Sequence, residues 1–102
     1  MSKRKLTKDG RYLDELIDAE REFFEKIWYT RTEGRFNRIE TGEEKLLTSE
    51  HQEAIIRNKQ RVIAERGIEN LGPHSDFEWG MLNGKLSAIR WVLGEEWDFL
   101  DT

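Results

Sequence analysis

Carboxylates are the chemistry-bearing residues that this sequence supplies in greatest number. They gather in three clusters: Asp18, Glu20, Glu22 and Glu25; Glu43 and Glu44; and Glu95, Glu96 and Asp98. Glu and Asp side chains on facing helices can hold Mg²⁺ through their oxygens, as in small helical nucleotide pyrophosphohydrolases. Those enzymes carry paired glutamates followed by Glu-x-x-Asp on the next helix, a pattern that is not matched here. Solvated acidic helix faces are the preferred interpretation, and a Mg²⁺-dependent hydrolase is the weaker alternative.

Other catalytic and metal-binding chemistry has little support. The chain has no cysteine, and its two histidines, His51 and His74, have no recognisable zinc spacing. There is no glycine-rich phosphate loop, nucleophile elbow or histidine-centred triad. We therefore expect a protein that is not an enzyme, with no catalytic residue, no metal site and no cofactor.

The segment predicted to form the second helix is basic, through Arg57, Lys59, Arg61 and Arg66, whereas the predicted first helix is acidic. Docking of complementary helices is the simplest explanation. The alternative is a nucleotide or nucleic-acid binder, in which Arg57, Arg61 and Arg90 would contact phosphate beside Trp91 at a subunit interface.

Two charged residues interrupt apolar stripes at helical spacing. Glu20 lies among Ile17, Phe23 and Phe24, and Lys59 lies between Ile55 and Val62. A buried charge without a partner is costly. We expect Glu20 to pair with Arg90 or Lys59, and Lys59 to extend its ammonium toward water. A ligand site at Glu20 is the alternative.

The segment 77–93 is the most informative part of the chain, because as a helix it has two faces suited to packing. One stripe holds Trp79, Leu82, Leu86, Ile89 and Leu93. A second stripe, roughly 160° away, holds Gly80, Gly84, Ser87 and Trp91. Each glycine inside a helix costs about 1 kcal/mol relative to alanine, so close approach of another backbone is expected there. We predict an interface made by this stripe with Trp97 and Phe99.

The predicted elements are helices at about 9–30, 50–66 and 75–93, within a single helical domain over 9–102. Gly34 is expected to end the first helix, and 32–47 favours a loop over a short hairpin. Ser49 with Gln52 matches a capping box, Gly67 suits a helix end, and Ser75 or Asp76 should cap the third helix. Residues 1–8 should form a basic flexible arm. The tail 95–102 is acidic and aromatic, and either docks on the bundle or recognises a partner protein.

Composition sets broad limits on the class of protein. The chain has 102 residues, of which 36% are hydrophobic and 37% charged, with a net charge of −4. A charged chain of this size with few apolar residues favours an oligomer. The basic start Met1–Lys5 is followed by no apolar run, and no segment suits a bilayer. We expect a cytoplasmic protein with no membrane association.

The last quarter of the chain, from Phe77 to Leu93 and on through Trp97–Thr102, resembles the ending of small uncharacterised helical proteins of bacterial, phage and prophage genomes. That group carries no assigned activity, so the resemblance implies no functional residue. It implies a phage-related accessory, structural or inhibitor role.

Together these patterns predict an all-α, three-helix bundle-like domain that oligomerises through its C-terminal helix. We expect a small binding or assembly protein that acts through protein–protein contacts, as a homo-oligomer with a protein partner as a further candidate. Binding of a nucleotide or nucleic acid is the runner-up.

Overall fold

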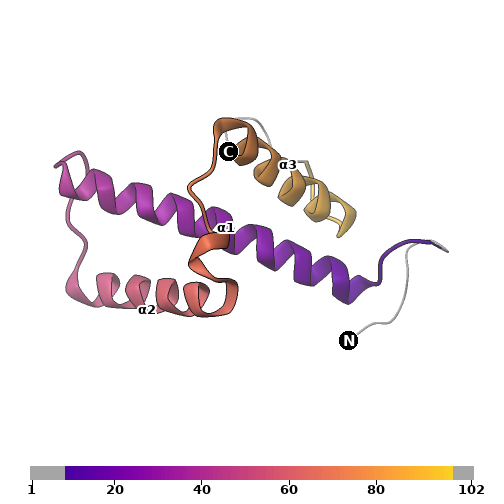
Figure 1. The fold of residues 1–102 in the computed structure, drawn as a ribbon, viewed down its shortest axis with the longest axis horizontal. Helices are drawn as coiled ribbons and strands as arrows, with labels where there is room; N and C mark the ends of the chain where they lie inside the picture. The colour runs from indigo at the N-terminus through magenta and orange to yellow at the C-terminus, as the bar shows by residue number, and fades with distance from the viewer. Residues whose placement is uncertain (1–8, 98–102) are drawn as a thin grey trace. The chain divides into compact units, whose positions relative to one another are not determined.

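The computed structural model describes residues 9–97 as an all-helical chain (Figure 1). Three α-helices, α1 (Leu13–Glu40), α2 (Ser49–Arg66) and α3 (Asp76–Val92), follow one another, with a short 3₁₀ helix, η1 (Ile68–Asn70), after α2. No strand occurs within 9–97. The predicted all-α class is confirmed. The basic arm 1–8 and the tail residues 98–102 lie outside the described residues.

The chain divides into two compact units. The terminal unit comprises, of the described residues, 9–24 and 74–97, and so contains the first part of α1 and all of α3. The central unit comprises 25–73, and so contains the rest of α1 with α2 and η1. A single domain over 9–102 stays a prediction.

Helix α1 is longer than the sequence predicted, and the predicted end at Gly34 is wrong. Residues 32–40, expected in a loop, are helical. A glycine within a helix costs only about 1 kcal/mol, which contacts elsewhere can offset. The compensating contacts come from α2: Lys59 pairs with Glu33, and its ammonium lies 5.2 Å from the centre of the Phe36 ring. Tertiary contacts therefore carry α1 past Gly34.

The predicted start of the first helix is also displaced, from about residue 9 to Leu13. The first turn is closed by Glu15, whose carboxylate accepts a hydrogen bond from the backbone N–H of Tyr12 at 2.9 Å. Acidic residues suit this end, because the helix dipole places partial positive charge there.

Helix α2 begins one residue earlier than the proposed capping box requires. Thr48, and not Ser49, is the N-cap, and its hydroxyl accepts a hydrogen bond from the backbone N–H of His51. The Gln52 side chain instead donates to the carbonyl of Leu47 at 2.7 Å. The predicted end is confirmed: Gly67 follows α2 with φ of +83°, which glycine adopts without steric cost.

Helix α3 has the cap that the sequence predicted. The Ser75 hydroxyl accepts from the backbone N–H of Glu78, and the Glu78 carboxylate accepts from the backbone N–H of Ser75, both at 3.1 Å. This reciprocal pair is a capping box. Gly94, with φ of +108°, lies just beyond the other end.

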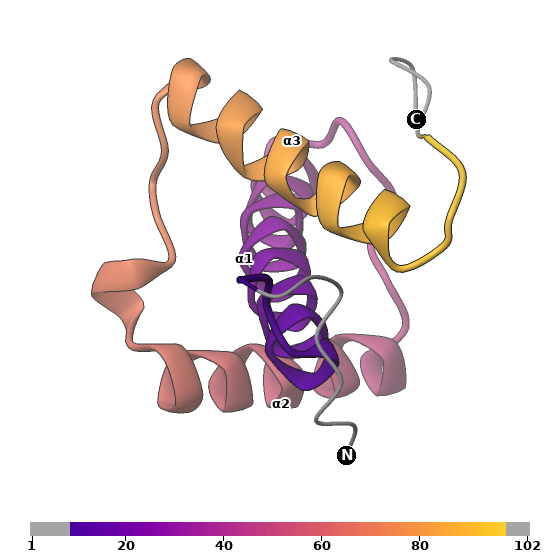
Figure 2. The same cartoon turned by 90° about the vertical axis from the view of Figure 1, so that its right-hand side faces the viewer.

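Each unit has a small apolar core. In the central unit Ile27, Val62 and Leu71 are buried, together with the hydroxyl-bearing Thr32. In the terminal unit Leu82 and Leu86 are buried, which places the first predicted stripe of α3 on its inner side. Figure 2 shows α3 crossing the first part of α1 in this unit. The opposite stripe of α3 is therefore left for other contacts.

Candidate interaction surface on α3

The outward face of α3 carries a continuous row of uncharged, exposed positions. These positions, which we call the α3 stripe, recur at steps of four, three, four and three residues: Phe77, Met81, Gly84, Ala88 and Trp91. Steps of this kind mark the seam along which two helices pack in a coiled coil. Phe77 is 75% exposed, Met81 44% and Trp91 49%, which is high for large apolar side chains. The stripe has the spacing of a packing seam, and all five of its positions are exposed in the part of the chain that the structure describes.

Small residues occupy the middle of the α3 stripe. A Cβ atom added at Gly84, or at Gly80 beside it, would meet no atom of the described residues within 4 Å. The close backbone approach predicted for these glycines is therefore not made by another described segment of the same chain. The space beside Gly80 and Gly84 can therefore accommodate a helix from another molecule.

The C-terminal end of the stripe is enlarged by a second tryptophan. Trp97, which follows α3, stacks on Trp91 with ring centroids 5.0 Å apart and ring planes 10° from parallel. Trp97 is 55% exposed, so the stacked pair still presents much of its surface to solvent. The tail thus lies against α3 as far as Trp97.

The residues of the predicted interface differ in their exposure. Gly80, Gly84, Trp91 and Trp97 are exposed, whereas Ser87 is partly buried, and Phe99 lies outside the described residues. Sequence reasoning missed Phe77 and Met81. Helical spacing was the available signal, because Phe77 and Met81 precede Gly84 by seven and three residues on the same face.

The inward face of α3 is held to α1 by contacts that include charges. Arg90 donates to Glu20 at 3.0 Å, and its guanidinium lies 5.4 Å from the centre of the Phe24 ring. Lys85 lies over Phe23 at 5.8 Å. The expected pairing of Glu20 with Arg90 is confirmed. Both side chains are partly buried, at 27% and 28% exposure, so water still screens this pair.

Lys59, the other charge predicted in an apolar stripe, belongs to the central unit. It pairs with Glu33, and its ammonium lies 5.7 Å from the centre of the Tyr29 ring. Its side chain is 20% exposed. Lys59 therefore combines an ion pair with cation–π contacts, which explains a cation between Ile55 and Val62.

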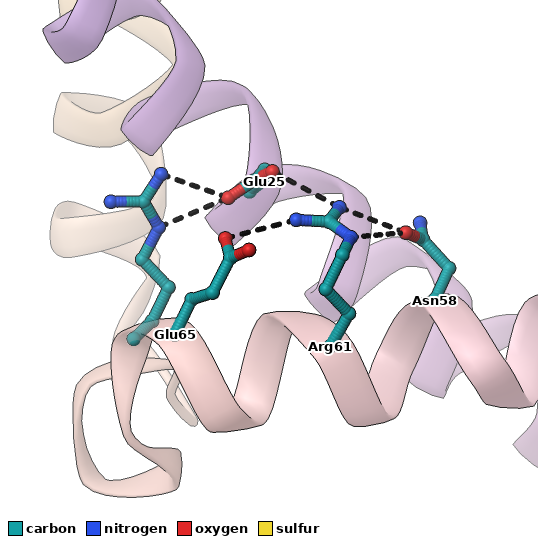
Figure 3. A network of polar contacts seen from close by, with 5 residues as sticks. Glu25, Asn58, Arg61 and Glu65 are labelled. Carbon is teal, nitrogen blue, oxygen red and sulfur yellow. Dashed lines mark hydrogen bonds and ion pairs between the residues drawn. The ribbon is translucent and has the colours of Figure 1, made fainter.

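Among the charged residues of 9–97, Glu25 is the most deeply buried, so the interpretation of its acidic cluster as a solvated helix face is wrong at this position. Its side chain is 7% exposed and lies between two arginines of α2 (Figure 3). Oε1 accepts two hydrogen bonds from Arg66, at 3.0 and 2.8 Å, and Oε2 lies 3.1 Å from Arg61. Arg61 also binds Glu65 at 2.9 Å and Asn58 at 2.8 Å. This network fixes α2 on the second part of α1.

These contacts bear on the three arginines considered for phosphate binding. The hydrogen bond to Glu25 raises the pKa of Arg61, whose guanidinium already has three partners. Arg90 is paired with Glu20 in the other unit. Arg57 is exposed and has no ion pair with the described residues. A phosphate would thus have to compete with carboxylates at two of the three positions.

Two glutamates at or near the surface have lowered pKa values, one in each unit. Hydrogen bonding to Arg38 lowers the pKa of Glu44, and the charge of Arg35, 3.4 Å away, acts in the same direction. The backbone N–H of Ser75, followed by its hydroxyl, lowers the pKa of Glu78. Both carboxylates are held ionised by contacts that organise local structure.

Two further features are absent from residues 9–97. No three His, Asp or Glu side chains converge there as a metal ion would require. None of the helices in that range has the length and apolar character needed to cross a membrane. Comparison of the chain with protein-family models, curated proteins and solved structures finds no match.

Proposed function

We propose that this chain is a small helical binding and assembly module that self-associates through the α3 stripe. One observation carries the proposal: five exposed positions at coiled-coil spacing hold no charged residue, from Phe77 to Trp91. Charged residues make up 37% of the chain, so an uncharged row of this length on an exposed helix face calls for a function. Exposed apolar patches of this kind mark interaction sites.

The area available is sufficient for a specific complex. The exposed parts of the stripe and of Trp97 amount to on the order of 600 Å² per copy, so a pair would bury about 1,200 Å². This value is at the lower end of specific protein–protein interfaces. The aromatic side chains at the ends are also the types that contribute most to binding energy. A reversible dimer of moderate affinity is the expected product.

Binding of a nucleotide or nucleic acid remains the alternative, and no contact among residues 9–97 favours it. Arg61 and Arg90 are engaged by carboxylates within their own units. The net charge of −4 also disfavours attraction of polyanions. Protein–protein contact is therefore the function we put forward.

The test uses two substitutions at equally exposed positions. Phe77 in the α3 stripe and Leu46 in the central unit are each 75% exposed. Light scattering after size exclusion should give twice the chain mass of 12.2 kDa for wild type and for Leu46→Arg. Phe77→Arg should shift the population to monomer, because a charge would be buried in the seam. Monomeric wild type at high concentration, or equal loss in both variants, would contradict the proposal.

The same measurement separates the alternative function. A dimer held by apolar contacts should keep its mass at low and high salt and with nucleotides added. A phosphate-binding protein should instead show thermal stabilisation by nucleotide that falls steeply with salt.

A further inference from the structure

We infer that two copies pair through the α3 stripe in antiparallel orientation, with a two-fold axis at Gly84. This inference rests on the proposed self-association and adds the geometry of the complex. It follows from the order of side-chain sizes along the stripe and from the charges beside it.

When two copies of the α3 stripe run in opposite directions, side chains before Gly84 in one copy lie opposite side chains after Gly84 in the other. Phe77 and Trp91 lie seven residues before and after Gly84, so a two-fold axis there sets each against the other in the second copy. Met81 and Ala88 lie three before and four after, so a long side chain meets a short one. Gly84 meets Gly84, where no described atom of the chain fills the space. The two layers that join Met81 and Ala88 thus combine side chains of complementary size.

A parallel pair would fit less well. It would set Met81 against Met81 and Ala88 against Ala88, so bulky layers would hold the helices apart and leave voids at the small residues. Voids of that kind forfeit packing contacts and destabilise an interface. Parallel helices also align their dipoles unfavourably.

The charges on one flank support the same orientation. Glu78 and Lys85 are exposed and lie seven residues apart along one edge of the stripe, where Glu78 also caps α3 and Lys85 also lies over the Phe23 ring of its own chain. In an antiparallel pair each flank faces the same flank of the second copy. With the axis at Gly84, Glu78 and Lys85 of the two copies are offset by roughly 7.5 Å along the helices, a distance that their long side chains can span, twice per dimer. In a parallel pair the flank carrying Lys85 faces the opposite flank, which carries the uncharged Gly80 and Ser87. Charge complementarity therefore selects the antiparallel register.

Cysteine cross-linking tests the orientation directly, because the chain has no cysteine of its own. Met81→Cys and Ala88→Cys are made separately at exposed positions, which leaves Phe77, Gly84 and Trp91 in place. At a rise of about 1.5 Å per residue, an antiparallel pair brings position 81 level with position 88 of the second copy. Each position would lie about 9–12 Å from its own copy, beyond disulfide reach.

The expected result is several times more disulfide-linked dimer in a mixture of the two variants than in either variant alone. Efficient cross-linking of each variant with itself would show a parallel pair, which overturns this inference and leaves the proposed function standing. A dimer by light scattering that cross-links in neither experiment would place the contact elsewhere, and would also overturn it. A monomer in every sample would remove the proposed function itself. Gly84→Leu, which fills the centre, should abolish the mixed cross-link.

Discussion

Two glutamates on α1, five residues apart, make ion pairs of different character. Glu25 in the central unit is 7% exposed in its side chain and is bound by Arg61 and Arg66. Glu20 in the terminal unit is 27% exposed and binds Arg90, which reaches Glu95 only at 3.8 Å. The same residue type on the same helix thus serves as a desolvated anchor at one position and a screened pair at the other.

These two pairs indicate that burial, more than pairing alone, determines how much an ion pair contributes to stability. A partly exposed ion pair adds little to stability, because water screens the charges and replaces lost hydrogen bonds. A buried carboxylate has lost its water, so each of its oxygens needs a donor, and loss of the group leaves its partners uncompensated. The central unit should therefore depend on its ion pairs far more than the terminal unit does.

The strongest test of this contrast is Glu25→Gln, which we expect to lower the free energy of unfolding by about 2–4 kcal/mol. The amide cannot satisfy both arginines, which would be left near a low-dielectric core. The estimate lies below the usual range for broken buried pairs, because Arg61 and Arg66 are 40% and 23% exposed. Urea denaturation followed by far-ultraviolet circular dichroism measures it. A loss under 1 kcal/mol would show that water reaches this site.

Glu20→Gln is the matched substitution in the terminal unit, and we expect a loss of only about 1 kcal/mol. Its sensitivity to salt should also differ, because screening weakens the Glu20–Arg90 pair more than the Glu25 network. Denaturation at low and high salt compares the two variants. If Glu20→Gln overlays wild type, the structural role of Glu20 is lost and a ligand site there becomes the better explanation. If Glu20→Gln lowers the free energy of unfolding as much as Glu25→Gln does, burial does not distinguish the two ion pairs.

The sequence predicted local features of this fold well where short-range chemistry determines them. A cap at Ser75, one of the two candidates, and the helix end at Gly67 depend on a few neighbouring residues, although the capping box expected at Ser49 and Gln52 is replaced by a cap at Thr48. The length of α1 does not, since its last turns are supported by Lys59, which lies more than twenty residues away in sequence. Such support cannot be read from periodicity, so the intrinsic preference of Gly34 was given too much weight.

The same limit explains which site residues were found. Glu20 lies on the apolar stripe of Ile17, Phe23 and Phe24, so a partner was expected for it, and Arg90 is one of the two candidates that were named. Glu25 lies about 140° around the helix from Glu20, at about 100° per residue, and thus off that stripe. Its own face continues through Tyr29, Thr32 and Phe36 at steps of four, three and four. This face of α1 was not recognised because it includes polar residues. Apolar periodicity does not detect a packed surface that has a charged residue at its centre.

The smallest expected effect concerns the two glutamates with lowered pKa values, one in each unit. For both, the folded pKa lies below the ordinary 4.5 of the unfolded chain. Their stabilisation should therefore be complete above that pH and be lost as the pH falls through the folded values. The causes differ, however. Salt bridges to Arg38 and Arg35 lower the pKa of Glu44, whereas the pKa of Glu78 is lowered mainly by a backbone N–H and the Ser75 hydroxyl, with a smaller contribution from the charge of His74.

Salt should therefore separate these two glutamates. Screening weakens attraction between exposed charges, whereas short hydrogen bonds from neutral donors are much less affected. Carbon-13 NMR titration of the side-chain carboxyls at low and high salt should show the pKa of Glu44 moving toward 4.5 while that of Glu78 stays lowered. Ser75→Ala is the internal control: it removes the hydroxyl donor and should raise the Glu78 value alone. Equal movement of both values with salt would mean that charge, and not the cap of α3, holds Glu78 ionised, and the contrast between the two units would then not extend to their surfaces.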